Sequence, residues 1–275
     1  QGNLPGHLAP RAVQIARATD DQALLRRFAA TKASGSLVPN GPLLLRLQPL
    51  DRTKYADGNR AITIRKSFPP SESIPRLKTL VKQRPEDAFI RSILADVLYR
   101  DQQYLKAKAT LDAVVADEPS DSEFWIIDSV VHEKMAQMAD DRAELLARAK
   151  ASAAEAIRLN PTVPEAFIAS AQAAELEGNF GSAERDWRKA AELSRNPRSI
   201  LKLQAAAWRN VGRLGEWSRA TDALLDLVRV AGPDVPEVQL EAAFAAYQAG
   251  RLDTASELAQ TLNATYRSIY EGRIR

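Results

Sequence analysis

Apolar residues recur at helical spacing over most of the chain, and short stretches rich in polar residues, glycine or proline interrupt them. One clear instance is AELEGNFGSAERDWRKA, residues 174–190, in which Gly178 separates two helical runs. In the second run Ala183, Trp187 and Ala190 follow one another at helical spacing. The pattern predicts a helical hairpin whose two helices meet at the glycine.

The same arrangement returns twice further along the chain. A turn glycine and a large residue two positions later occur as Gly178 and Phe180, Gly212 and Leu214, and Gly250 and Leu252. The intervals between the glycines are 34 and 38 residues. The four extra residues fit VAGPDVPEV, where glycine and two prolines break the helix and lengthen the turn. We therefore expect a repeated helix pair.

Residues of fixed size accompany each predicted pair. The point where the two helices meet carries a small residue, at Ala95, Ser129, Ala171, Ala205 and Ala243. The second helix opens with an alanine at Ala107, Ala183 and Ala255, whereas Trp217 takes that position in the fourth pair. The second pair is longer than the others, and HEKMAQMADDRAELLARAK is the expected place of the lengthening. Small residues here let helices approach closely, and large ones fill the space beside them.

This ordered set resembles the tetratricopeptide repeat, a helix–turn–helix unit of 34 residues, over about five units between residues 85 and 262. The resemblance implies an all-α fold: an α-solenoid, that is, a right-handed superhelix of helix–turn–helix repeats whose concave face is lined mainly by the first helix of each pair. Residues 85–275 would form this solenoid. Residues 1–84 would form an irregular, partly helical, basic N-terminal segment that packs on the solenoid or leads into it.

The resemblance also selects residues for partner binding, because fixed positions of the first helix face the groove in that family. Mapped onto this chain, they include Tyr99, Arg100, Glu175, Lys202, Arg209, Asn210, Phe244 and Tyr247. Such a groove suits an extended or helical peptide with apolar anchors and some negative charge. The Lys, Asn and Arg set that clamps a C-terminal carboxylate in some family members is absent, which disfavours a chaperone-tail adaptor. The alternative that these residues pack against the chain's own N-terminal segment stays open.

The first 84 residues do not follow the repeat. Residues 11–31 read as two short helices with Asp20 or Asp21 near an N-cap, and residues 32–51 read as a loop rich in glycine and proline. In NRAITIRKSF, residues 59–68, two isoleucines alternate with polar residues, which predicts a short strand or an extended segment. Residues 71–85 read as a helix with Ser73 as N-cap and Pro75 in the first turn.

Charge is unevenly distributed along the chain. Residues 1–84 carry fifteen Lys and Arg against five Asp and Glu, a net charge of +10, whereas the remaining 191 residues carry twenty-three against thirty, a net charge of −7. The basic segment is either an arm for an anionic partner or a segment that docks on the chain's own acidic body. No apolar run approaches the roughly 20 residues that span a bilayer, and no signal peptide is visible. Because the chain begins with Gln1, we expect a preceding segment to have been removed.

Little in the sequence points to catalysis. There is no cysteine, which excludes disulfides, thiol catalysis and cysteine-ligated metals. The two histidines are His7 and His132, and we expect the latter to be a partly exposed helical residue. Acidic residues such as Glu184 and Asp186 read as spaced surface charges, and no phosphate-binding loop occurs. The sequence therefore predicts a protein that is not an enzyme, with no catalytic residue, metal site, cofactor or small-molecule substrate.

Two functional hypotheses follow. The first is a scaffold that holds a protein or peptide in the solenoid groove, similar to bacterial envelope-assembly proteins of the polysaccharide-export or pilus kind, which favours the periplasm or cell envelope over the cytoplasm. The alternative is that the basic arm binds nucleic acid or an anionic membrane or polymer. No RNA-binding module supports nucleic acid, so membrane association is the more open of these. Since no capping helix follows the fifth unit, we also expect either a longer native chain or a partner at that end.

Overall fold

The computed structural model describes residues 57–140 and 142–271, with side chains up to residue 262. The expectations for residues 1–56, including the two short helices, the loop and most of the basic arm, lie outside the described residues. The described part falls into two units, residues 57–177 and residues 178–271, here named the N-terminal unit and the C-terminal unit. Each is described by itself. The boundary expected after residue 84 stays a prediction.

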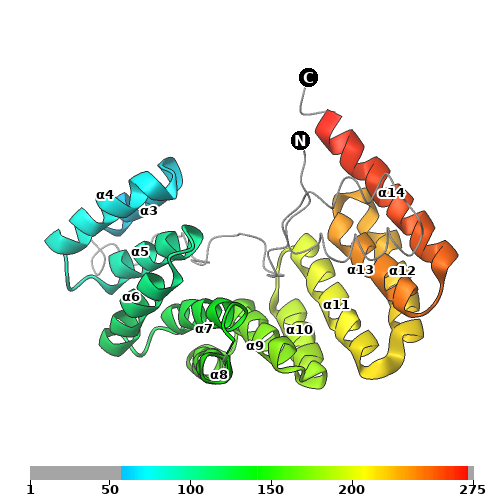
Figure 1. Ribbon diagram of the computed structural model, residues 1–275, viewed down its shortest axis with the longest axis horizontal. Coiled ribbons are helices and arrows are strands. Elements are labelled where there is room, and N and C mark those ends of the chain that lie inside the picture. Colours follow the sequence, from blue (N-terminus) through cyan, green and yellow to red (C-terminus); the bar gives the residue numbers. More distant parts are fainter. Residues whose placement is uncertain (1–56, 141, 272–275) are drawn as a thin grey trace. The chain divides into compact units, whose positions relative to one another are not determined.

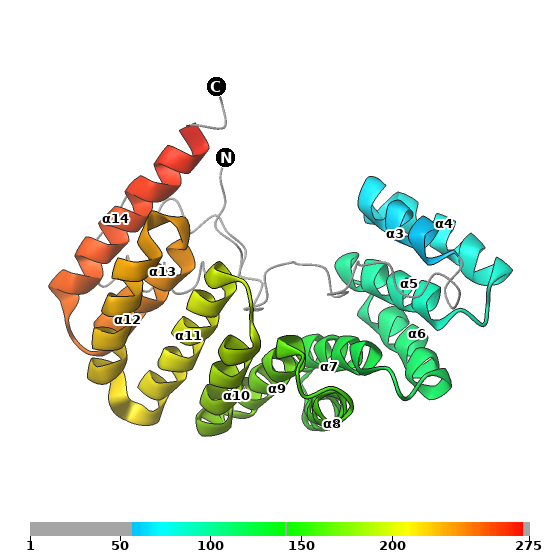
Figure 2. The ribbon, with the colours of Figure 1, turned by 180° about the vertical axis from the view of Figure 1, so that it is seen from behind.

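The N-terminal unit is a succession of antiparallel helices in which each contacts the next (Figures 1 and 2). They are α3 (Gly58–Ser67), α4 (Pro70–Gln83), α5 (Ala88–Arg100), α6 (Tyr104–Asp117), α7 (Ser122–Ala136), α8 (Ala143–Leu159) and α9 (Pro164–Glu177). The odd-numbered helices also contact one another in sequence, so they form one layer. We call α3, α5, α7 and α9 the A helices of this unit, and α4, α6 and α8 its B helices.

The C-terminal unit repeats this arrangement. It contains α10 (Phe180–Leu193), α11 (Pro197–Val211), the π-helical turn η1 (Gly212–Glu216), α12 (Trp217–Ala231), the 3₁₀ turn η2 (Gly232–Asp234), α13 (Pro236–Gln248) and α14 (Leu252–Glu271). Its A helices are α11 and α13, which contact each other, and its B helices are α10, α12 and α14. Every regular element in the described part is helical. The all-α fold of stacked helix pairs predicted from the sequence is therefore confirmed.

The small residues of the repeat lie where the pattern places them. The five at the helix contact, Ala95, Ser129, Ala171, Ala205 and Ala243, are at most 1% exposed. The alanines expected to open the second helices, Ala107, Ala183 and Ala255, are the fourth residues of those helices and are fully buried. The hydroxyl of Ser129 donates a hydrogen bond to the carbonyl oxygen of Ala149 at 2.8 Å, which satisfies a polar group at a position otherwise held by alanine. The expected lengthening is also confirmed, because α8 has 17 residues where α6 has 14.

The predicted turn in the fourth pair was wrong by three residues. Gly212 is buried and helical, with φ −58° and ψ −44°, and the left-handed residue is Gly215, with φ 102°. Trp217 therefore opens the second helix, as Phe180 and Leu252 do, and Ala220 takes the buried small position assigned to Trp217. The π-helical turn accommodates the additional residues by widening the end of the first helix.

The segment expected to be extended is helix α3. Its alternating isoleucines are both half-buried, while Ala61 and Arg65, one helical turn apart, are buried against the neighbouring helices. The Nε of Arg65 lies 2.5 Å from Oδ2 of Asp96 on α5. Because one of the buried residues is the charged Arg65, the apolar positions do not show the period of a helix. The two isoleucines alternate with polar residues instead, which is the pattern of a strand.

The start of the following helix also differs from the prediction. Helix α4 begins at Pro70, with proline at its first position, and Ser73 lies inside the helix instead of capping it. The Ser73 hydroxyl contacts the carbonyl oxygens of Ile64 and Phe68 at 3.2 and 3.0 Å. The serine thus satisfies the carboxyl-terminal end of α3 and not the amino-terminal end of its own helix.

One turn residue makes a testable prediction. Gln102 precedes α6 with φ 62°, at the point where Gly178 and Gly250 have φ 84° and 76° in their own hairpins. A side chain costs about 1 kcal/mol in this conformation. Gln102→Gly is therefore expected to raise the free energy of unfolding by about 0.5–1 kcal/mol in urea titration. Gln260→Gly, in the middle of α14, is the control and should lower it by about 1 kcal/mol; equal effects of the two changes would contradict the prediction.

Candidate partner-binding site

Charged side chains on the A helices are paired across neighbouring helices. The pairs are Arg65 with Asp96 at 2.5 Å between α3 and α5, and Lys202 with Glu237 at 2.6 Å and Arg209 with Glu241 at 2.8 Å between α11 and α13. The first and third pairs are almost fully buried. Each partner thus offsets the cost of burying the other charge, and the pairs fix the register of successive repeats.

Because of these contacts and of burial, three residues expected to bind a partner are less available to one. Arg209 is 2% exposed and Asn210 is fully buried, with its Nδ2 donating to the carbonyl oxygen of Ala206 at 2.9 Å. Neither presents a surface to a partner, which corrects the expectation from the repeat positions. Lys202 is half-buried, and Glu237 matches its charge. The expected preference for a negatively charged partner therefore has no support in the C-terminal unit.

Aromatic rings remain accessible in both units. In the N-terminal unit Tyr99 on α5 meets Tyr104, the first residue of α6, edge to face with ring centroids 5.5 Å apart. In the C-terminal unit Phe244 on α13 meets Trp217, the first residue of α12, in the same manner at 5.7 Å. All four side chains are partly exposed. We call these the two aromatic pairs.

Two further predicted residues flank the aromatic pairs in sequence. Tyr247 lies one turn after Phe244 on α13 and is partly exposed. Arg100 follows Tyr99 at the end of α5 and is exposed. Partly exposed aromatic rings beside polar groups are the residue types that most often anchor a protein partner.

Glu133 on α7 connects two of the predicted residues of the N-terminal unit. Its Oε1 accepts a hydrogen bond from Nε2 of Gln137 at 2.7 Å, and its Oε2 is buried without a hydrogen-bond partner in the described part of the chain. Burial and the nearby Glu175 raise the pKa of Glu133 to about 8. Burial and the Glu133 charge raise the pKa of Tyr99 above its usual value. Tyr99, Glu133 and Glu175, from three successive A helices, thus form one electrostatic group, and Glu133 was not among the residues predicted from the sequence.

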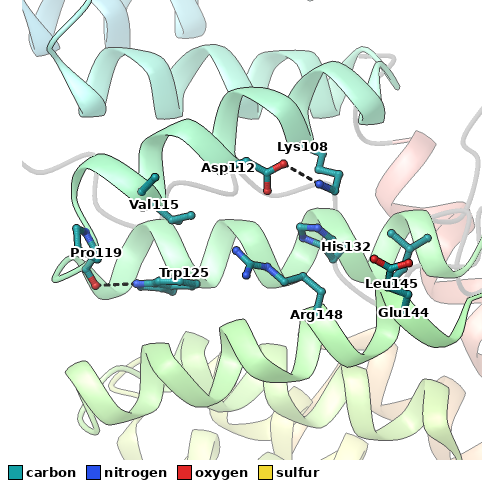
Figure 3. Close-up of a pocket in the computed structure, with 10 residues that line it drawn as sticks. Lys108, Asp112, Val115, Pro119, Trp125, His132, Glu144, Leu145 and Arg148 are labelled. Carbon is teal, nitrogen blue, oxygen red and sulfur yellow. Dashed lines mark hydrogen bonds and ion pairs between the residues drawn. The ribbon is translucent and has the colours of Figure 1, made fainter.

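A pocket of about 490 Å³ lies between the B helices α6 and α8 and the A helix α7 (Figure 3). Its lining includes Lys108 and Asp112 from α6, Trp125 and His132 from α7, and Arg148 from α8. Lys108 binds Asp112 at 2.6 Å, and the guanidinium of Arg148 lies 5.4 Å from the centre of the Trp125 ring. No residue of this pocket was selected from the sequence.

Asp128 organises polar contacts beneath that pocket. Its Oδ2 accepts hydrogen bonds from the Ser152 hydroxyl at 2.5 Å and from Nε of Arg148 at 3.1 Å, while Nδ1 of His132 lies 3.3 Å from Oδ1. Burial acts to raise the pKa of this carboxyl, but the contacts with His132, Ser152 and Arg148 outweigh burial and lower it. His132 is 1% exposed, which corrects the expectation of a partly exposed residue.

A signal for these buried polar groups does exist in the sequence. The stretch SEFWIIDSVVHEKMA is apolar around most of its helix, and such a helix is buried on all sides. The polar residues within it, Asp128, His132 and Glu133, must then be buried as well and require partners.

Comparison with known proteins bears on the fold. No protein-family model and no curated protein sequence matches the chain. Among solved structures, the chain is similar to TTC0263, a thermophilic tetratricopeptide-repeat protein of Thermus thermophilus, with a TM-score of 0.55, 17% identity and coverage of 71% of this chain and 98% of that one. It is also similar to a tetratricopeptide-repeat protein from Parabacteroides merdae, with a TM-score of 0.51, 11% identity and coverage of 94% and 99%.

A third similar structure is BtubC from P. vanneervenii, with a TM-score of 0.51, 14% identity and coverage of 76% of this chain and 92% of that one. At these identities the likeness concerns the path of the backbone and not the residues of a site. The helix pairs, the buried small residues and these structural neighbours agree: the chain has the fold of the tetratricopeptide-repeat proteins.

Proposed function

We propose that this protein is a non-catalytic scaffold that holds a protein or peptide partner on the A-helix side of its units. The aromatic pairs carry this proposal, because each unit keeps two rings partly exposed where a residue of an A helix meets the first residue of a B helix. A partner that covers them would remove apolar surface from water without any change of the fold.

The charge distribution supports apolar anchors as the main contacts. Lys202 and Arg209 of α11 are already matched by glutamates of α13, so a partner gains little from these two cations. In the C-terminal unit Phe244, Trp217 and Tyr247 offer partly exposed aromatic surface to a partner. The preferred partner is therefore a peptide or helix with large apolar side chains.

Capture of a partner from lysate of the native cells tests the proposal. The intact chain is used as bait beside Tyr247→Ala and the double variant Phe244→Ala with Tyr247→Ala, and bound proteins are quantified by mass spectrometry. Removal of an anchor aromatic side chain typically weakens binding by about tenfold or more. We expect the principal partner to be depleted at least to that extent with the double variant, and to an intermediate level with Tyr247→Ala.

A matched control removes apolar side chains from the B helices. Leu105 on α6 and Val230 on α12 are each 75% exposed, so Leu105→Ala and Val230→Ala delete apolar surface at residues that are not among the proposed anchors. These variants should capture the partner as the intact chain does. Thermal unfolding of every bait establishes that it is folded. Equal capture by the folded anchor variants and by the intact chain would reject the aromatic surface as the binding site.

Two further expectations, a cell-envelope location and anion binding by the basic N-terminal residues, are tested separately from the aromatic surface. The described part of the chain contains no helix that is long and apolar enough to cross a bilayer. Placement in a bacterial cell envelope is testable by fractionation of native cells. Binding of an anionic polymer or membrane through residues 1–56 would appear as a salt-sensitive affinity that is lost when those residues are deleted.

A further inference from the structure

Three potential ligand atoms converge at the pocket between α6, α7 and α8. Asp112, Asp128 and His132 each offer one such atom, and the three atoms lie within 4.8 Å of one another. Asp112 comes from α6, whereas Asp128 and His132 are four residues apart on one face of α7. The ligand set therefore joins the second helix of one repeat to the first helix of the next.

The contacts around His132 leave one ring nitrogen available. Nδ1 lies 2.8 Å from the backbone carbonyl oxygen of Asp128. A carbonyl oxygen only accepts hydrogen bonds, so the proton of the neutral ring is held on Nδ1 and the lone pair is on Nε2. In the described part of the chain Nε2 makes no hydrogen bond, although the side chain is only 2% exposed and lines the pocket. This is the arrangement in which metal-binding histidines are held by a backbone carbonyl.

The two carboxylates are oriented in a similar way. Oδ2 of Asp128 is occupied by Ser152 and Arg148, while its buried Oδ1 accepts no hydrogen bond and lies 3.3 Å from Nδ1 of His132. Oδ2 of Asp112 accepts from Lys108 at 2.6 Å, and among the described residues no hydrogen bond reaches its Oδ1. In each carboxylate an outer group therefore holds one oxygen and leaves the other for a ligand, as in the outer shell of metal sites.

We propose that Asp112, Asp128 and His132 bind a divalent transition-metal ion, and that Zn²⁺ fits them best. One imidazole nitrogen with two carboxylate oxygens is a ligand set of zinc, whereas calcium and magnesium prefer oxygen ligands throughout. Three protein ligands leave a fourth position for another ligand, and two of the three, Asp112 and His132, line the pocket (Figure 3). The site goes beyond the proposed scaffold function and departs from the absence of a metal expected from the sequence.

The spacing of the three ligands and the charges beside them determine the affinity for zinc that we expect. Ligands of a tetrahedral zinc ion at 2.0–2.2 Å are about 3.4 Å apart, so the set has to close from its present spacing. Asp112 is half-exposed and held by one lysine, which allows this side chain to move. Lys108 and Arg148 add positive charge beside the ion and weaken its binding, so we expect a dissociation constant on the order of 10 µM instead of the far tighter binding of closed structural zinc sites.

Titration of zinc into the chelator-treated full chain tests the site. A His7→Ala background removes the other histidine of the chain. In this background we expect one zinc ion per chain by calorimetry, and a rise of the thermal midpoint by about 3 °C at 0.1 mM zinc, because the ion binds the folded chain. Asp112→Asn, at a half-exposed position, should weaken zinc binding at least tenfold, as should His132→Gln.

Glu144→Gln is the matched control, because Glu144 lines the same pocket and carries the same charge but is not among the three ligands. It should bind zinc within about twofold of the unsubstituted chain. Three results would each overturn the proposal: no zinc binding up to 1 mM, binding by a folded Asp112→Asn variant with unchanged affinity, or equal loss in Glu144→Gln, which would assign the effect to pocket charge and not to ligation.

Discussion

Replacing Glu133 with glutamine is expected to stabilise the protein strongly at pH 9 and to change its stability little at pH 5. The reason is the difference between the two states of the wild-type carboxyl group. Burial and Glu175 raise the pKa of Glu133 from 4.5 to about 8 in the folded protein. Between these values the folded chain holds a proton that the unfolded chain has released, so the free energy of unfolding falls as pH rises.

The size of the effect follows from the shift. Stability from the neutral carboxyl is complete below pH 4.5 and is lost as pH rises through about 8. The full shift corresponds to about 5 kcal/mol, and because water can reach an ionised carboxylate when α7 relaxes, a loss of about 2–3 kcal/mol is expected. A glutamine keeps the shape and the contact with Gln137 but does not ionise, so this loss should be absent in Glu133→Gln.

Urea unfolding of both proteins at several values from pH 5 to pH 9 measures the difference directly. Groups far from Glu133 cancel when the two curves are subtracted, whereas Lys134 and Tyr99 feel the Glu133 charge, so the difference reports Glu133 together with these neighbours. Glu144→Gln, which removes an exposed carboxylate from the same unit, is the control and should follow the wild-type curve. Parallel curves for Glu133→Gln and wild type would show that Glu133 is ionised in the folded protein throughout this range.

This titration also bears on partner binding. Glu133 lies in one electrostatic group with Tyr99 and Glu175, which were both selected as binding residues. A partner that places a cation beside this group would favour the ionised form of Glu133 and lower its pKa. The same pH series, repeated with the partner once it is identified, therefore reports whether the partner covers the A helices of the N-terminal unit.

The sequence predicts those parts of the fold that depend on the size of one residue. Ala95, Ala171 and Ala243 recur because two helices can approach closely only over a small side chain, and this requirement is visible without the structure. The glycines at 178 and 250 are predictable for a similar reason, since their φ angles of 84° and 76° favour a residue without a side chain. A steric requirement at one position restricts the residue type at that position, so it can be recognised in the sequence.

The buried polar residues and their partners could not be predicted in the same way. Arg209 was expected to face a partner because its repeat position does so elsewhere, yet Glu241, on the next A helix, binds it within the protein. Asp128 was missed because its contacts come from Arg148 and Ser152 on α8 as well as from its own helix, and His132, which contacts Asp128, was expected to be partly exposed. Such pairings depend on which residues of successive repeats come into contact, and a pattern within one repeat does not contain that information.

Gly212→Ala is expected to lower the free energy of unfolding by roughly 2–3 kcal/mol. The backbone at Gly212 is helical, so an alanine meets no conformational penalty and gains about 1 kcal/mol of helix propensity. Its Cβ, however, would lie 2.2 Å from Cε3 and 2.4 Å from Cζ3 of Trp217. The indole must move, and its packing against Phe244 and the core beside Val238 must move with it. Chemical unfolding measures the net loss.

Gly181→Ala is the matched control, because Gly181 lies in the first turn of α10 and a Cβ there would meet no atom within 4 Å. It should be neutral or stabilising by up to about 1 kcal/mol. A second variant, Gly212→Ala with Trp217→Leu, separates two explanations for a loss at Gly212. If the indole is the obstacle, the two changes will couple by more than about 1 kcal/mol, since a smaller side chain leaves room for the methyl group. If the turn were at Gly212, as its 34-residue spacing from Gly178 suggested, alanine would be strained whatever side chain stood at position 217, and the two losses would add.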